Sequence, residues 1–158
     1  MMAKWKAVEL EEITDMLAEF GDSWRSIAKE ALYDGRKIMR ESLEREVDNI
    51  PTTAKDKYYP DFLTPIRTIR PAEKEGLKQS IRIYKMKSDV DGVSVAIGFE
   101  GYNERGRPNA LIARSLVKGT SVVQPNRFVD RAFNSSIKKC EEAIGKKVEY
   151  IATKTFSK

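Results

Sequence analysis

Residue types that carry out covalent chemistry are scarce in this chain. It contains no histidine and a single cysteine, Cys140. These counts exclude a Ser-His-Asp triad, a Cys-His pair, a His-ligated zinc site, an intrachain disulfide and a Cys-rich metal site. Cys140 lies in a stripe of apolar residues spaced three or four apart, so we expect it in the hydrophobic core rather than at a reactive site.

The remaining candidates for chemistry are carboxylates and glycine-containing loops. Asp89 and Asp91 flank a turn, but no bidentate glutamate follows at the spacing of a calcium loop, so we expect them to form the turn. Gly101 and Gly106 have the spacing that begins a phosphate-binding loop, but Arg107 follows where such a loop needs lysine. We therefore expect no catalytic residue, no metal and no cofactor, and predict that the chain is not an enzyme.

The charge is divided unevenly along the chain. The 158 residues carry a formal net charge of +5, with 29 Lys and Arg against 24 Asp and Glu. Residues 1–50 hold 8 basic and 12 acidic side chains, whereas residues 76–158 hold 16 basic and 8 acidic ones. The basic part could bind nucleic acid, the two parts could pack head to tail between copies, or both could be solvated faces.

The elements that position these residues begin with helices. Apolar residues recur three and four apart, and a break at Gly21-Asp22-Ser23 divides the pattern into a helix over about 7–20 and a long helix over about 23–48. Four prolines then exclude a continuous helix over 50–75 and predict an extended arm. Its apolar side chains are expected to contact a partner; they are Tyr58, Tyr59, Phe62, Ile66 and Ile69.

The second half of the chain predicts a sheet followed by a helix. Residues 80–87 and 93–99 alternate polar and apolar side chains around an Asp-Val-Asp-Gly turn, which is typical of a β-hairpin. We assign residues 76–121 to the sheet region, in which 110–117 fits either strand or helix, and 125–153 to a C-terminal helix. The expected fold is α+β in one domain over 1–158: a small antiparallel sheet packed by a long N-terminal helix and a C-terminal helix.

Three short motifs occur in a fixed order along these elements. Gly76-Leu77-Lys78-Gln79-Ser80-Ile81 leads into the sheet, and Gly119-Thr120-Ser121 follows it. Gln124-Pro125-Asn126-Arg127-Phe128 then opens the last helix. We expect Gly119 to adopt a backbone angle that other residues avoid, Thr120 to bond the turn backbone, and Phe128 to anchor the helix to the sheet. Together these elements resemble the tail-completion or neck protein family of long-tailed bacteriophages, also described as minor tail or head–tail joining proteins.

The resemblance covers roughly residues 8–150, with three departures. The loop at 51–75 is longer than the family pattern leads us to expect. Lys118 stands where the family often has an acidic residue, and Asn126-Arg127 separates Pro125 from Phe128. The resemblance implies a structural virion protein, assembled in the host cytoplasm and located in the tail or neck. It would form a homo-oligomeric ring, expected to be a hexamer, that contacts tail-terminator, tail-tube or head-connector proteins, with DNA only as passing cargo.

A small basic DNA-binding protein is the alternative. Arg105 and Arg107 are expected in a flexible loop, where they could also contact a partner subunit. Lysines of the last helix, at 138, 139, 146 and 147, could add a basic face that attracts phosphate. No run of about 18 apolar residues is present, so we expect no membrane partner.

Overall fold

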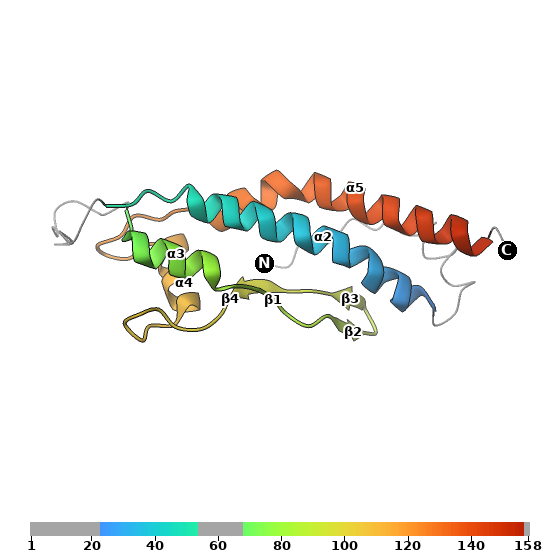
Figure 1. The fold of residues 1–158 in the computed structure, drawn as a ribbon, viewed down its shortest axis with the longest axis horizontal. Helices are drawn as coiled ribbons and strands as arrows, with labels where there is room; N and C mark the ends of the chain where they lie inside the picture. Colours follow the sequence, from blue (N-terminus) through green and yellow to red (C-terminus); the bar gives the residue numbers. More distant parts are fainter. Residues whose placement is uncertain (1–22, 54–67, 157–158) are drawn as a thin grey trace.

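The chain folds into two layers, as seen in a computed structural model that describes residues 23–53 and 68–156. Helices α2 (Ser23–Asp48) and α5 (Phe128–Phe156) lie antiparallel along the long axis (Figure 1). The short helices α3 and α4 and a β-hairpin form the second layer. The α+β class predicted from the sequence is confirmed.

The two long helices agree with their predicted ranges. Helix α2 has the predicted limits, and α5 begins at Phe128 rather than at residue 125. The helix expected over about 7–20 lies outside the described residues. The same is true of four residues of the expected arm, namely Tyr58, Tyr59, Phe62 and Ile66.

The β-hairpin consists of two antiparallel strand pairs. Strand β1 (Ile81–Ile83) pairs with β4 (Ile97–Phe99), and β2 (Lys87–Asp89) pairs with β3 (Gly92–Ser94). Asp89 lies opposite Gly92 at the turn. The alternating pattern and the Asp-Val-Asp-Gly sequence therefore predicted the hairpin and its turn correctly.

Two helices occupy segments that the sequence analysis assigned differently. Helix α3 (Pro71–Gln79) replaces the end of the arm expected over 50–75 and the start of the sheet region expected over 76–121. Pro71 stands in the first turn, where its missing N–H removes no helical hydrogen bond, so it begins the helix. Helix α4 (Asn109–Lys118) takes up the run that fitted either strand or helix, and buries Ala113 and Leu116.

The hydrophobic core lies where the two layers meet near the end of α2 and the start of α5. Its buried members are Leu43, Val47, Ile50, Ile69, Leu77, Ile81, Ala113, Leu116, Phe128 and Ala132. The Phe128 ring is fully buried and meets the Phe99 ring edge-on, with 6.0 Å between centroids. This packing confirms that Phe128 anchors the last helix to the sheet.

Ile69 belongs to this core, which corrects the prediction that it contacts a partner. Its side chain is 5% exposed. The Ile69 amide donates to the Pro51 carbonyl oxygen (3.0 Å), and the Thr53 amide donates to the Ile69 carbonyl oxygen (3.1 Å). A short parallel bridge therefore joins Thr52 to Ile69, so that residues 51–53 and 68–70 lie side by side next to the core.

Small residues fill the contact between α2 and α5. The buried ones are Ala31, Gly35 and Ser42 on α2, and Ala132, Ser136 and Cys140 on α5. The Ser42 hydroxyl donates to the Ala132 carbonyl oxygen (3.0 Å), and the Cys140 thiol donates to that of Gly35 (3.3 Å). A Cβ at Gly35 would lie 2.9 Å from Ile144 Cδ1, so the glycine allows the helices to approach closely.

Candidate functional site

The turn between α4 and α5 contains the Gly-Thr motif. Gly119 has a φ of 73°, and a Cβ there would lie 2.8 Å from the Pro125 ring and 2.9 Å from the Val123 carbonyl oxygen. The Thr120 hydroxyl accepts hydrogen bonds from the Val122 and Val123 amides (3.3 and 3.1 Å). Both roles predicted for Gly119 and Thr120 are confirmed, and Pro125 closes the turn against the glycine.

The Gly76-to-Ile81 motif is a helix end that continues into a strand. Leu77 and Ile81 are fully buried in the core. The Ser80 hydroxyl donates to the Leu77 carbonyl oxygen (2.7 Å), which satisfies a carbonyl at the end of α3. Gly76 has open space where a Cβ would stand. Leu77, Ser80 and Ile81 therefore hold the fold together, and Gly76 faces a hollow.

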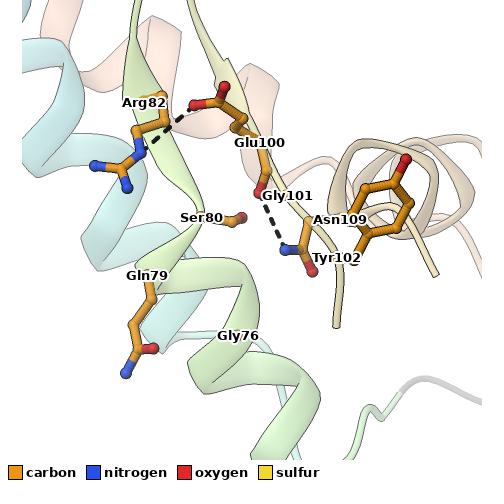
Figure 2. Close-up of a pocket in the computed structure, with 8 residues that line it drawn as sticks. All are labelled: Gly76, Gln79, Ser80, Arg82, Glu100, Gly101, Tyr102 and Asn109. Carbon is orange, nitrogen blue, oxygen red and sulfur yellow. Dashed lines mark hydrogen bonds and ion pairs between the residues drawn. The ribbon is translucent and has the colours of Figure 1, made fainter. Parts of the chain in front are cut away.

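This hollow lies at the base of the hairpin and measures about 500 Å³ (Figure 2). We call it the hairpin-base hollow; its lining residues are Gly76, Gln79, Ser80, Arg82, Glu100, Gly101, Tyr102 and Asn109. The Arg82 Nε lies 3.6 Å from the Glu100 carboxylate at its rim, and both side chains are exposed. Tyr102 is 72% exposed beside it.

Asn109 fastens one wall of the hairpin-base hollow. Its amide N–H donates to the Gly101 carbonyl oxygen (2.9 Å), and its side-chain Nδ2 donates to the Glu100 carbonyl oxygen (3.1 Å, Figure 2). Its Oδ1 is buried and has no hydrogen-bond partner among the described residues. The sequence analysis missed Asn109 because only the loop 101–108 brings it back to the end of β4.

Arg105 and Arg107 lie in that loop, as expected, and the loop forms a hydrogen-bonded turn. The Asn103 carboxamide oxygen accepts hydrogen bonds from the Arg105 and Arg107 amides (3.0 and 2.9 Å). The Asn103 amide donates to the Arg107 carbonyl oxygen (2.8 Å). Both arginine side chains are exposed and form no ion pair within 23–53 and 68–156. Their guanidinium groups are therefore open to solvent.

A second hollow, of about 520 Å³, lies where α2 ends and α5 begins. We call it the arginine hollow; its lining residues are Asn49, Pro51, Gln124, Pro125, Asn126, Arg127 and Arg131. Arg131 is held by the Glu46 carboxylate (2.7 Å) and the Asn126 carboxamide oxygen (3.0 Å). Arg127 is exposed and forms no ion pair with any other described residue. The sequence analysis missed this hollow because its walls come from segments far apart in the chain.

Several large apolar side chains remain exposed on separate elements. They are Tyr33, Tyr84, Val90, Tyr102, Leu111, Phe133 and Tyr150. Val90, at the hairpin turn, is 95% exposed. The Arg36 guanidinium stacks on the Tyr33 ring at 3.6 Å from its centroid. Aromatic side chains such as these tyrosines serve as anchors in protein interfaces.

Cys140 and the lysines of α5 lie on different sides of the helix. Burial raises the pKa of the Cys140 thiol, and the side chain packs in the α2–α5 contact as predicted. Lys138, Lys139 and Lys146 are exposed, whereas Lys147 is bound by Glu30 (3.2 Å). The basic face is therefore formed by the first three of these lysines.

Comparison of the chain with protein-family models, with curated proteins and with solved structures gives no match. None of the described helices is long and apolar enough to cross a membrane. In residues 23–53 and 68–156, no group of three or more Cys, Asp or Glu side chains is arranged to hold a metal ion.

Proposed function

We propose that this chain is a structural virion protein of the neck or tail top of a long-tailed bacteriophage, where a ring of identical subunits completes the tail or joins it to the head connector. The observation that carries the proposal is the joint between α4 and α5. Gly119, Thr120, Pro125 and Phe128, which carry much of the resemblance, form one structural unit there. These residues therefore have structural roles of their own in this chain, and the proposal rests on them together with the resemblance.

The partners proposed are copies of the chain and the tail-terminator, tail-tube or head-connector proteins. A ring needs a heterologous contact, in which two different surfaces of the same subunit meet. The acidic 1–50 segment and the basic 76–158 segment are suited to such a contact. Exposed apolar groups on several elements add surfaces for the neighbouring rings.

Electron microscopy of particles made without this chain tests the proposal. We expect filled heads and separate tails, because the proposed ring joins them. Complementation with the wild-type chain from a plasmid should restore joined, infectious particles. Joined particles of normal infectivity made without the chain would overturn the proposal.

The segment 54–67 is proposed to anchor the chain to a neighbouring subunit or ring. Because Ile69 is buried in the core, the test must leave residues 68–70 intact. We therefore suggest replacing Tyr58, Tyr59 and Phe62 together by serine. The variant should unfold at the same denaturant concentration as the wild type but fail to complement; infectious particles from it would exclude this role.

DNA binding is the second candidate, favoured by the exposed side chains of Arg105 and Arg107, which form no ion pair with another described residue. A fluorescence anisotropy titration with duplex DNA at several salt concentrations tests it. A DNA-binding protein that contacts six phosphates loses roughly a thousandfold in affinity between 50 and 200 mM salt. We expect no saturable binding at about 150 mM salt, where the Debye length is near 8 Å; salt-dependent, saturable binding lost in the Arg105→Ala and Arg107→Ala variant would favour DNA instead.

A further inference from the structure

The hairpin turn projects an apolar side chain between two carboxylates. Val90 is 95% exposed, and Asp89 and Asp91 on either side are exposed as well. Neither carboxylate forms an ion pair within the described part of the chain. Lys87 is also exposed but lies further back on β2, so the acidic charge is confined to the end of the turn.

Hydrogen bonds stabilise this turn. The Asp91 amide donates to the Asp89 carboxylate (3.1 Å), and the β2–β3 pairing continues up to the Asp89–Gly92 pair. A preformed projection loses little conformational entropy on binding, which favours its use as a contact. We call residues 89–91 the hairpin tip.

The arginine hollow has the complementary features. Arg127 is exposed there without an anionic partner among the described residues, and Arg131 lies one helical turn further on, already bound by Glu46. Pro51 and Pro125 supply exposed apolar walls. A ligand that combines an apolar side chain with a neighbouring carboxylate therefore fits both the walls and the free charge.

The hairpin tip and the arginine hollow lie toward opposite ends of the long axis. In Figure 1, β2 and β3 lie beneath the first half of α2, whereas α2 ends and α5 begins at the other end. One subunit therefore does not bring its own tip to its own hollow. Between two copies, however, a tip-to-hollow contact leaves one tip and one hollow free. These can bind further copies until the ring closes.

We propose that the hairpin tip of one subunit binds in the arginine hollow of the next, with Val90 between Pro51 and Pro125 and the carboxylates of Asp89 and Asp91 beside Arg127. This inference rests on the proposed ring and names the two surfaces that close it. Arg131, held by Glu46 and Asn126, supports the hollow and contributes less to the contact.

Two single variants disrupt the two surfaces separately. Val90→Ser removes the apolar group from the tip, and Arg127→Glu places a like charge opposite the tip carboxylates. Each is expected to raise the concentration needed for self-association at least about tenfold, as loss of an interface anchor does. Leu111→Ser and Lys139→Glu are the matched controls, since both side chains are exposed and neither residue belongs to the tip or lines the arginine hollow. They should associate like the wild type.

A mixture of the two disrupted variants gives the sharpest test, read by sedimentation velocity on the full chains. One intact tip and one intact hollow remain in the mixture, so it should form a one-to-one dimer and nothing larger. At the lowest concentration at which the wild type forms complete rings, rings of wild-type size from either variant alone, or from the mixture, would overturn the tip-to-hollow contact while leaving the proposed ring intact. A wild-type chain that stays monomeric would instead overturn the ring, and the inference with it.

Disulfide formation gives a second, independent measurement. With Cys140 replaced by serine, the double variant Val90→Cys and Arg127→Cys should form a covalent ladder of multimers under mild oxidation. Neither single cysteine variant should form the ladder, because each would need two tips, or two hollows, to lie in contact. A ladder from Leu111→Cys and Lys139→Cys of equal intensity, or none from the tip–hollow pair while rings form, would contradict the assignment.

Discussion

Where α2 ends and α5 begins, large side chains from both layers interlock, whereas at the opposite end the buried residues of α2 and α5 among those described are small, namely Ala31, Gly35 and Cys140. The first end, the core end, contains Phe128, Leu77 and Ile81, all fully buried. At the second, the far end, Ile144 and Val148 are only partly buried. Figure 1 shows the far end as the two long helices with the β2–β3 part of the hairpin beneath them.

The difference indicates where stability and interaction surfaces are located. Fully burying a large apolar side chain stabilises a protein by about 1.5–3 kcal/mol, and most such side chains lie at the core end. The far end depends on close helix approach at Gly35 and on the bond from Cys140 to its carbonyl oxygen. It has apolar surface left over for contacts, including Tyr33, Val90 and Tyr150.

The largest effect is expected from truncating the core end. Phe128→Ala should destabilise the chain by about 3–5 kcal/mol, because it leaves a cavity and removes the contact with Phe99. Phe133→Ala on the same helix, where the ring is 38% exposed, should lose less than about 1 kcal/mol. Equal losses for the two variants in urea unfolding would remove the distinction between core and surface on α5.

The turn that joins α4 to α5 should be the next most sensitive position. Gly119→Ala adds a left-handed backbone cost of about 1–2 kcal/mol and also forces a Cβ against the Pro125 ring and the Val123 carbonyl. We expect a total loss above about 2 kcal/mol. Gly106 has a φ of 69° and nothing near its Cβ, so Gly106→Ala measures the cost of the backbone conformation alone. We expect it to destabilise the chain by about 1 kcal/mol. A smaller loss at Gly119 than at Gly106 would show that the turn contacts are unimportant.

At the far end, Gly35→Val should separate the helices locally. Its Cβ meets the Ile144 side chain, which can move, so the expected loss is only about 1–2 kcal/mol. The hydrogen bond from the Cys140 thiol should weaken, and the normally slow reaction of this buried thiol with Ellman's reagent should accelerate. Unchanged thiol reactivity with unchanged stability would mean that close approach at Gly35 is not what holds the far end.

The smallest effect is expected at Gly145 on the outer face of α5. Nothing lies within 4 Å of a Cβ built there. Gly145→Ala should therefore stabilise the chain by about 0.5–1 kcal/mol through helix propensity alone, seen as a shift of the urea midpoint with an unchanged slope. Destabilisation would reveal a neighbour of this face that residues 23–53 and 68–156 do not supply.

The sequence predicted the elements whose signals are local. The helical spacing defined α2, and the turn residues at 89–92 defined the hairpin. Pro71 was predicted to lie in the extended arm because proline interrupts a helix. Proline is equally suited to the first turn of a helix, and the residues that follow it form α3. The run 110–117 fitted both a strand and a helix in the sequence. The structure shows a helix, which buries Ala113 and Leu116.

The surfaces were predictable only in part. Arg105 and Arg107 lie in a loop as expected, but the turn that this loop forms is hydrogen-bonded to the Asn103 side chain, a contact that spacing does not encode. Ile69 is an apolar residue of the kind expected at an interface. A backbone hydrogen bond to Pro51 instead holds it in the core. Both hollows combine residues that are distant in the sequence, so their walls follow from tertiary packing rather than from any motif.

The central claim is that identical copies of this chain close into a ring through one tip-to-hollow contact per neighbour. Native mass spectrometry of the full-length wild-type chain, over a range of concentrations and at low and high salt, tests it most directly. The account predicts a single dominant species with a fixed integer number of subunits, six being expected, and only minor open intermediates. A monomer under every condition, or a distribution of sizes that grows with concentration and has no preferred member, would contradict it.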